Sequence, residues 1–282
     1  MITTTNVDTK DFMWTSNLNF NYNKNKILKL GDNDEDIIIG PDSKVILRVG
    51  ESLGMFRGYI RDGVWTEAER AEALAAGANV GQSKHSSSQE MLDAKGLPDW
   101  TGSFINTFRY KNLDLTVDLQ FVYGVEAYQS YLHSTEDRFG GANGLKTILT
   151  DGYNGSNPNT MVQAIRNFRL WNHGSLSRQD DHYVCDASYI RGNLIQLGYT
   201  FDRKLISKAG LSALRIDFSV NNAFLICSKD FKGFDPEGSS TPPTLSSANL
   251  STNLSDIAFG QNIYFFQYPK ARTFTLGLNV TF

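Results

Sequence analysis

Three aspartates at alternate positions, Asp32, Asp34 and Asp36, open a segment that resembles a calcium-binding loop. Carboxylate oxygens at this spacing are ligands for Ca²⁺ in an EF-hand, which also needs a glycine at the sixth position and a glutamate at the twelfth. Those two positions hold Ile37 and Ser43 here. The segment is therefore interpreted as a solvated acidic turn rather than as a metal site.

Histidines offer little more chemistry. The chain has His85, His133, His173 and His182, scattered without the spacing of metal ligands. His182, next to Asp180 and Asp181, comes closest to a cluster. A nucleophile elbow, a phosphate-binding loop and a Cys/His pair are all missing from the sequence. We therefore expect no catalytic residue, no metal site and no cofactor, and we predict that the protein is not an enzyme.

Two carboxylates at alternate positions, Asp235 and Glu237, lie in the segment GFDPE. On an extended chain they would project to the same side, as acid–base chemistry requires. The Asp-Pro step is typical of a turn, which favours a structural loop. Trp171 and Tyr183 are predicted to be exposed loop aromatics, which could stack on a sugar or pack against a partner.

Composition excludes several classes of protein. The chain has 282 residues with 27 basic and 30 acidic side chains, a net charge of -3, so no basic surface for nucleic acid is indicated. It contains no run of about eighteen apolar residues, and hence no predicted transmembrane helix. Cys185 and Cys227 belong to no CxxC motif and are predicted to be free thiols. The first residues, MITTTNVDTK, do not look like an export signal.

Strict alternation of polar and apolar residues is the main structural pattern. In TFTLGLNVTF (273–282) the apolar residues fall on one face of a strand and Thr, Gly and Asn on the other. In residues 113–124 the same pattern places Asp114 and Asp118 opposite a row of apolar side chains. An ionised aspartate is costly in a dry interior but not beside water. These strands are therefore expected to have water on one face and apolar material on the other.

The rest of the chain supports an all-β fold. Strands of similar pattern are predicted near residues 13–23, 44–50, 54–60, 100–110, 188–201, 213–224 and 261–269. A two-residue turn at Lys111 and Asn112 joins two of them, and residues 66–77 are predicted to form a short helix. Residues 125–183 are predicted to be a long loop region with weak helical potential around 126–135 and 160–168. About eight strands, several longer than usual, and this long loop are typical of an outer-membrane barrel.

Several segments together resemble the C-terminal barrel portion of the SusC/RagA-like TonB-dependent outer-membrane transporters of Bacteroidota. They are NYNKNKI (21–27), VGESLGMFRGYIRDGVW (49–65), LPDWTGSFINTFRYKNLDLTV (97–117), RLWNHG (169–174), DASYIRGNLIQLGYTF (186–201), NNAFLI and GFDPE (221–237), and YPKARTFTLGLNVTF (268–282). The resemblance implies an antiparallel transmembrane β-barrel segment, about 8 strands of a larger barrel of roughly 22, with long extracellular loops and one or more short helices.

The resemblance also implies a division of labour in the longer protein. Residues 1–282 would be the C-terminal part of the barrel, without the plug domain and the N-terminal signal. The implied partners are a SusD-like surface lipoprotein, the remainder of the transporter with its plug, TonB through the missing N-terminal part, and outer-membrane lipid. The function would be import of an oligosaccharide or a peptide across the outer membrane of a Gram-negative, Bacteroidota-like cell.

Individual residues take architectural roles in this hypothesis. Phe282 would be the terminal aromatic of the barrel-assembly signal. The lumen-facing residues would be Asp114, Asp118, Asp217 and Asn279, and the lipid-facing residues would be Leu115, Leu197, Leu214 and Phe274. Two alternatives stay open at this point: a soluble secreted β-sandwich that binds glycans, and a complete narrow barrel of about eight to ten strands.

Overall fold

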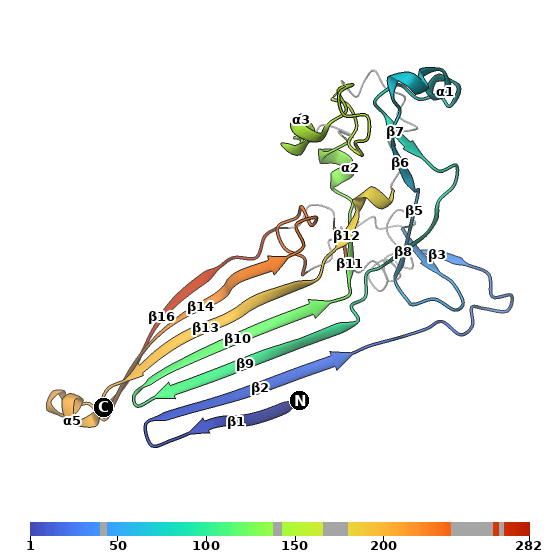
Figure 1. Ribbon diagram of the computed structural model, residues 1–282. Coiled ribbons are helices and arrows are strands. Elements are labelled where there is room, and N and C mark those ends of the chain that lie inside the picture. Colours follow the sequence, from blue (N-terminus) through green and yellow to red (C-terminus); the bar gives the residue numbers. More distant parts are fainter. Residues whose placement is uncertain (40–43, 138–142, 166–179, 238–261, 265–267) are drawn as a thin grey trace, which may run out of the picture.

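Seven antiparallel strands dominate the structure, a computed structural model that describes residues 1–39, 44–137, 143–165, 180–237, 262–264 and 268–282. We call these strands the main sheet; they lie side by side in Figure 1. In spatial order they are β1 (Ile2–Asp8), β2 (Phe12–Tyr22), β9 (Trp100–Tyr110), β10 (Leu113–Tyr123), β13 (Tyr189–Thr200), β14 (Ala213–Cys227) and β16 (Thr273–Thr281). The prediction of an antiparallel all-β fold is confirmed.

Connections between the strands differ sharply at the two ends of the main sheet. At one end they are short: residues 9–11, residues 111–112, and residues 201–212, which carry α5 (Arg203–Ile206) and η5 (Ser207–Ala209). At the other end they are residues 23–99, 124–188 and 228–272. The predicted hairpin is present, with Lys111 at a φ of 51°. The long connections therefore all lie at one end of the main sheet and the short ones at the other.

The three long connections fold together, and we call their described part the cap. It contains three small sheets with the strands β3 (Ile37–Ile39), β4 (Val45–Leu47), β5 (Met55–Gly58) and β8 (Glu90–Lys95), then β6 (Arg61–Val64) and β7 (Ser83–His85), then β11 (Glu126–Gln129), β12 (Val184–Asp186) and β15 (Ile263–Tyr264). Its helices are η2 (Glu67–Glu69), α1 (Arg70–Ala75), α2 (Leu132–Thr135), α3 (Thr147–Asp151) and η4 (Asp181–Tyr183).

Two expectations for the cap are wrong in part. In residues 125–183 the helix α2 lies within the range of predicted helical potential at 126–135, but the strand β11 and the helix α3 are not part of that prediction. The strand expected at 261–269 is the short β15, which pairs in parallel with β11 in the cap instead of joining the main sheet. The helix expected at 66–77 is confirmed as η2 and α1, with a capping box between Thr66 and Glu69 and with Gly77 at a φ of 72°.

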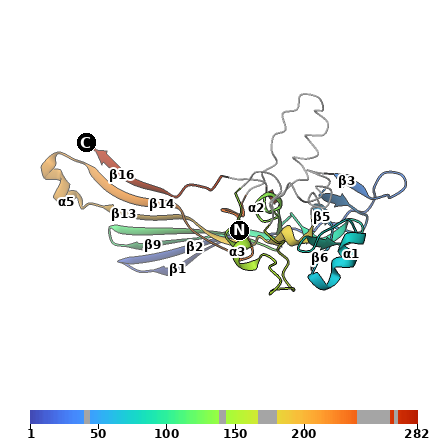
Figure 2. The same cartoon turned by 90° about the horizontal axis from the view of Figure 1, so that it is seen from above.

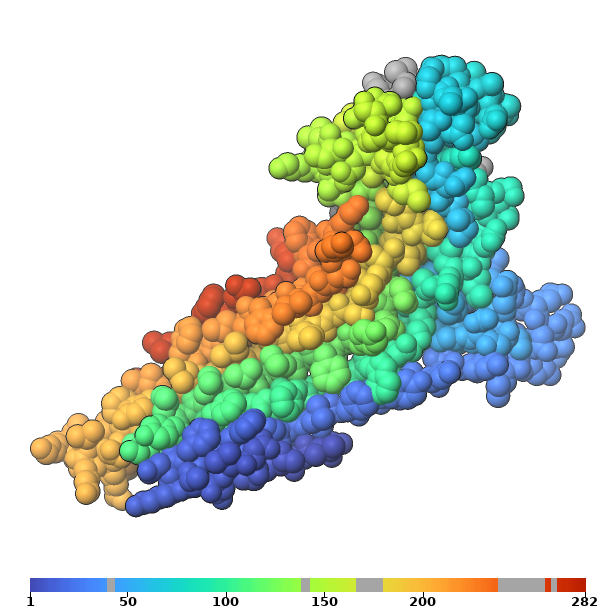
Figure 3. Space-filling model, viewed as in Figure 1, coloured from blue at the N-terminus to red at the C-terminus, as the bar shows by residue number. Residues whose placement is uncertain are grey.

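The buried core lies in the cap, not in the main sheet. Its two clusters centre on Phe56, Tyr128 and Tyr183, and on Val125 and Phe231. Large apolar side chains of the main sheet stay open instead, such as Leu276 at 75% exposed. Figure 2 shows the strands as one curved layer, and the space-filling view shows the cap standing at one end (Figure 3). The described residues form no second sheet that packs on this layer, as a β-sandwich would require.

Cross-strand register gives the main sheet two different faces. Residues directly opposite each other on neighbouring strands lie on the same face. One row is apolar on all seven strands: Val7, Trp14, Phe108, Leu115, Leu197, Phe218 and Leu276. The adjacent row is polar throughout: Thr5, Thr15, Thr107, Thr116, Gln196, Ser219 and Thr275. We call these the apolar face and the polar face.

The apolar face carries one polar cluster. Asn106 accepts hydrogen bonds through Oδ1 from Trp14 Nε1 at 3.0 Å and from Ser16 Oγ at 2.7 Å. Asn6, at a bulge in β1, donates to Ser16 Oγ at 2.6 Å. Because these groups bond one another, they can lie among apolar side chains without the cost of an unpaired polar group.

None of the helices formed by the described residues is long and apolar enough to cross a membrane.

A glycine allows close packing on the apolar face, which can be tested. A Cβ atom at Gly102 would overlap the ring of Phe121 and the backbone oxygen of Asn19. Gly102→Ala is therefore expected to lower the free energy of unfolding by about 1–3 kcal/mol, as overpacking does. Thermal unfolding followed by circular dichroism measures the change. Thr101→Ala, on the opposite face of the same strand, is the control and should cost less than about 1 kcal/mol; equal losses would contradict the packing.

Candidate functional site

The polar face is the first candidate for contact with a solute. Arg215 on β14 reaches across β13 to Asp114 on β10, with Arg215 Nη1 2.5 Å from Asp114 Oδ1 and Nη2 2.8 Å from Oδ2. The bridge passes over Gly198, where a Cβ atom would overlap the guanidinium group. A hollow of about 400 Å³ lies here on the polar face. Most of its lining residues are polar, and they carry both signs of charge, which suits contact with water and polar solutes.

The structure separates the two predicted sets of residues by face. Asp114 is in register with Gly198, and Gly198 with Asp217. Asp217 accepts hydrogen bonds from Gln196 at 3.3 Å and Asn279 at 3.5 Å. Register places the following residues on the polar face: Asp114, Asp118, Asp217 and Asn279. It places Leu115, Leu197, Leu214 and Phe274 on the apolar face. That the polar face borders a lumen stays a prediction.

A second set of charged groups is buried inside the cap around Arg61. The guanidinium group lies 2.6 Å from Asp137 Oδ2 and 2.7 Å from Asp180 Oδ2. It also donates to the hydroxyl of Tyr183 at 3.1 Å and to the backbone oxygen of Met161 at 2.8 Å. The side chains of Arg61 and Asp180 have no exposed surface. Four residues of the connection 124–188 therefore bind one cation that belongs to the connection 23–99.

These ion pairs determine the charge states inside the cap. Burial alone would raise the pKa of Asp137, but the charge and hydrogen bonds of Arg61 outweigh it and hold that pKa below its ordinary value. Burial would lower the pKa of Arg61, but Asp137, Tyr183 and Asp180 raise it well above the ordinary value. Both groups are therefore charged at neutral pH. Burial, followed by the charge of Asp137, raises the pKa of Tyr183, which stays a neutral donor.

Glu136, next in the chain to Asp137, joins a second buried network. Its carboxylate contacts His182 Nε2 through one oxygen and Lys232 Nζ at 2.6 Å through the other. Burial would raise the pKa of Glu136, but His182 and Lys232 lower it. His85 Nε2 lies 2.6 Å from Asp180. Two of the histidines that the sequence shows as scattered therefore contact carboxylates, whereas His173 lies outside the described residues.

The two predicted loop aromatics have different outcomes. Tyr183 is not an exposed aromatic, because the cap buries it completely and its hydroxyl group bonds Asp137 and Arg61. It is not accessible to a solute in this structure. Trp171 lies outside the described residues. Phe282 follows β16 and is 88% exposed. Arg61, the central residue of the cap, gave no signal in the sequence, since a single arginine in a short polar segment has no distinguishing pattern.

Most of the carboxylates considered for chemistry form ion pairs or hydrogen bonds within the fold. Arg191 Nη2 lies 2.5 Å from Asp235 Oδ1, and Arg191 Nε lies 3.2 Å from Glu237. Glu237 also pairs with Lys270 at 2.7 Å. In the acidic turn, Asp36 pairs with Arg48 and Asp34 accepts a hydrogen bond from the backbone nitrogen of Leu30. Both segments are therefore built as parts of the fold, in line with their interpretation from the sequence.

Comparison with known proteins gives a consistent set of relatives, although no protein-family model matches the chain. The chain is 30% identical to the TonB-dependent receptors P3 and P26 of Formosa agariphila, across 100% of its own length and 28% of theirs. It is 26% identical to the TonB-dependent receptor SusC of Bacteroides thetaiotaomicron, across 97% of its length and 25% of that protein. The chain thus spans about a quarter of the length of these relatives.

Solved structures share the fold. A chain of the RagAB peptide importer in its open-open state superimposes with a TM-score of 0.71 at 20% identity, over 99% of this chain and 28% of that one. The importer in its closed-closed state gives a TM-score of 0.70 at 21% identity over the same shares. At these identities the likeness concerns the fold. The main sheet and the cap therefore have a counterpart in a much larger chain.

The ion cluster makes a prediction about the cap. Arg61→Met would leave Asp137 and Asp180 buried without their cation, which should reduce the local stability of the cap by about 3–5 kcal/mol. Hydrogen–deuterium exchange in residues 132–137 and 180–187 measures this loss. Arg70→Met is the matched control, since Arg70 pairs with Glu67 at the surface with 60% of its side chain exposed. It should change stability by less than about 1 kcal/mol. Similar exchange in the two variants would contradict a central role for Arg61.

Acid is expected to weaken the cap. The pKa values of Glu136 and Asp137 are lowered in the folded protein. As the pH falls, the same carboxyl groups therefore take up protons in the unfolded chain, at about pH 4, before they do so in the folded protein. Their stabilising effect is present above that pH and is lost as the pH falls through the lower folded-state values. Hydrogen exchange at pH 7 and pH 3, corrected for intrinsic rates, checks this. Asp137→Asn should reduce the pH dependence; an unchanged profile would refute the assignment.

Proposed function

We propose that this chain, a homologue over its full length of part of the TonB-dependent receptors that include SusC, forms a section of the wall of an outer-membrane importer. The observation that carries the proposal is the pair of adjacent rows on the main sheet, one apolar and one polar on all seven strands. Such a sheet fits a wall with lipid on one side and water on the other.

The dimensions of the strands support a membrane location. A transmembrane strand that is tilted needs about 9–11 residues. β2, β9 and β10 have 11 residues each, and β13 has 12. The exposed leucine and phenylalanine side chains of the apolar face would then be covered by hydrocarbon. In water the same surface would favour aggregation, because it is a large contiguous apolar patch.

Open edges suggest how this section joins the rest of a barrel. β1 and β16 each have one strand neighbour among the described residues, so each leaves one edge without a partner there. Unpaired edges are unfavourable inside a membrane, where backbone groups have no water to bond. We infer that both edges pair with strands supplied by a longer protein, in which residues 1–282 would be the C-terminal part of a barrel of roughly 22 strands. Phe282 would then end the last strand as the barrel-assembly signal.

The polar face and the cap would handle the transported solute. The water-filled side would be lined by Asp114, Asp118, Asp217 and Asn279. Charged groups there stay hydrated and avoid the free-energy cost of burial away from water. The cap would lie outside the cell, because outer-membrane barrels carry their long connections there. A SusD-like lipoprotein would cover it, and TonB would supply energy through other parts of the protein. The relatives are named as receptors and a peptide importer; we propose a peptide or an oligosaccharide as the solute and no enzymatic step.

Substitutions on opposite faces test the proposal. Leu197→Arg places a charge on the apolar face, where it should impair insertion strongly, at a cost of about 2–4 kcal/mol near the middle of the membrane. Asn279→Arg places the same charge on the polar face, beside Asp217, and insertion should continue. Heat-modifiable migration of the protein from outer-membrane fractions, in the longer chain that contains this section, measures insertion.

Equal insertion of the two arginine variants would contradict the assignment of the faces. A second measurement distinguishes a membrane wall from a soluble protein. The chain should need detergent for extraction, and a monodisperse folded species in plain aqueous buffer would favour a soluble glycan-binding module instead. The polar variant Asn279→Arg also serves as the control for added charge, because both variants carry one extra arginine.

A further inference from the structure

Aromatic rings gather where the apolar face meets the cap. Tyr22, Trp100 and Tyr123 stand in one cross-strand row at the cap end of β2, β9 and β10. The ring centroids of Tyr22 and Trp100 are 4.3 Å apart, and Phe20 adds a ring 4.6 Å from Trp100. Aromatic girdles of this kind mark the level of the lipid headgroups on membrane barrels. In the proposed orientation this row would lie at the cap-side surface of the membrane.

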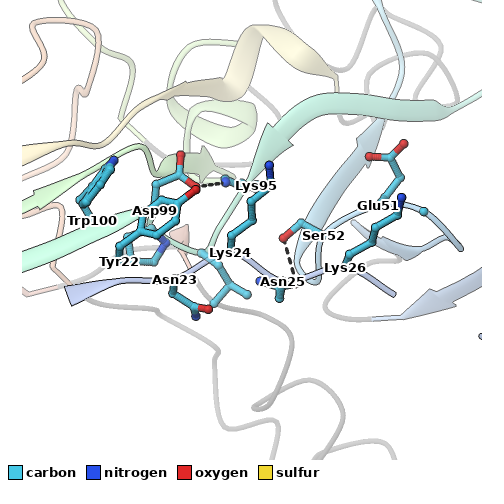
Figure 4. Close-up of a pocket in the computed structure, with 13 residues that line it drawn as sticks. Tyr22, Asn23, Lys24, Asn25, Lys26, Glu51, Ser52, Lys95, Asp99 and Trp100 are labelled. Atoms are coloured by element: carbon cyan, nitrogen blue, oxygen red, sulfur yellow. Dashed lines mark hydrogen bonds and ion pairs between the residues drawn. The ribbon is translucent and has the colours of Figure 1, made fainter. Parts of the chain in front are cut away.

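A hollow of about 610 Å³ opens next to this aromatic row (Figure 4). Tyr22 and Trp100 lie at one end of it, and Lys26 and Glu51 lie at the other. Lys24, Lys95 and Asp99 lie between them. The lining of the hollow therefore carries aromatic rings at one end and lysine ammonium groups along the rest.

Of the three lysines that line the hollow, only Lys95 forms an ion pair with a described carboxylate. Lys95 Nζ pairs with Asp99. Lys24 and Lys26 are exposed, and neither makes an ion pair with the described part of the chain. Glu51 is the other carboxylate of the lining. The hollow thus has an excess of positive charge, which is complementary to an anion.

The segment that carries these lysines is held in place. Its backbone bonds the start of β9 through Asn23 N and Asp99 O at 3.0 Å, and it bonds Glu51 O through Ile27 N at 2.8 Å. Between them, Asn25 Oδ1 accepts a hydrogen bond from the backbone nitrogen of Leu53 at 2.7 Å. Lys24 and Lys26 are therefore presented from a fixed backbone, which lowers the entropy cost of binding.

We propose that this hollow binds the phosphorylated sugar headgroup of an anionic membrane lipid. The inference rests on the proposed function, because it needs the apolar face to contact lipid. Lys24 and Lys26 would pair with the phosphate, and the sugar ring would lie against Trp100 and Tyr22. Sugars suit this wall because they combine an apolar face with polar edges. The acyl chains would continue down the apolar face past Phe20.

The experiment measures lipid binding by the full-length protein in detergent, using native mass spectrometry. The probe is lipid A, a diphosphorylated disaccharide lipid, and phosphatidylglycerol and inorganic phosphate are the comparisons. The double variant Lys24→Ala with Lys26→Ala should weaken lipid A binding about 10- to 30-fold, because each lysine near an anionic membrane surface contributes a modest part of the binding free energy. Lys10→Ala with Lys29→Ala removes the same charge from exposed positions that do not line the hollow, and it should leave binding unchanged.

A second variant keeps the test independent of the lysines. Glu51→Gln removes the opposing carboxylate while the backbone bond from Ile27 remains, so lipid A binding should strengthen severalfold. Equal weakening by both lysine pairs would overturn the proposal, as would binding of phosphatidylglycerol or inorganic phosphate as tight as that of lipid A. If all variants insert and only the lipid result fails, the headgroup site is wrong and the wall function stands. Failure of Leu197→Arg to block insertion would remove both.

Discussion

Cross-strand register is the constraint on which the rest of this structure depends. The side-chain period of a strand is two, so a shift of one residue in the register of β13 would move Leu197 to the polar face and Gln196 to the apolar face. The observed pairing instead aligns one apolar residue from each of seven strands in a single row. A single layer can then separate two solvents without a core of its own.

Hydrogen bonds make one departure from the pattern tolerable, and a glycine makes room for an ion pair on the polar face. Asn106 and Ser16 lie on the apolar face but bond each other and Trp14. Gly198 leaves room on the polar face for the bridge between Arg215 and Asp114. The sheet therefore combines a regular apolar surface with a polar surface on which Arg215 and Asp114 form an ion pair.

The cap follows a different principle from the sheet. Its interior is built around buried charges, with Arg61 bound to Asp137 and Asp180 and with Glu136 bound to His182 and Lys232. Removing one member leaves others unpaired in a dry environment, so such networks specify one arrangement strongly. This gives long connections a fixed shape above the main sheet.

Local sequence determined six of the seven strands of the main sheet, their faces and the helix at 66–77, because alternation and capping depend on residues a few positions apart. It also separated Asp114, Asp118, Asp217 and Asn279 from the apolar set before any register was known. The sequence did not indicate β1, whose ITTTNVD is mostly threonine and has little contrast between faces. Only the tertiary structure decided that β15 joins the cap, that Tyr183 is buried, and that Arg61 meets Asp137 and Asp180. Those ion pairs join residues 76 and 119 positions apart, and no local pattern records which distant carboxylate a buried cation will reach.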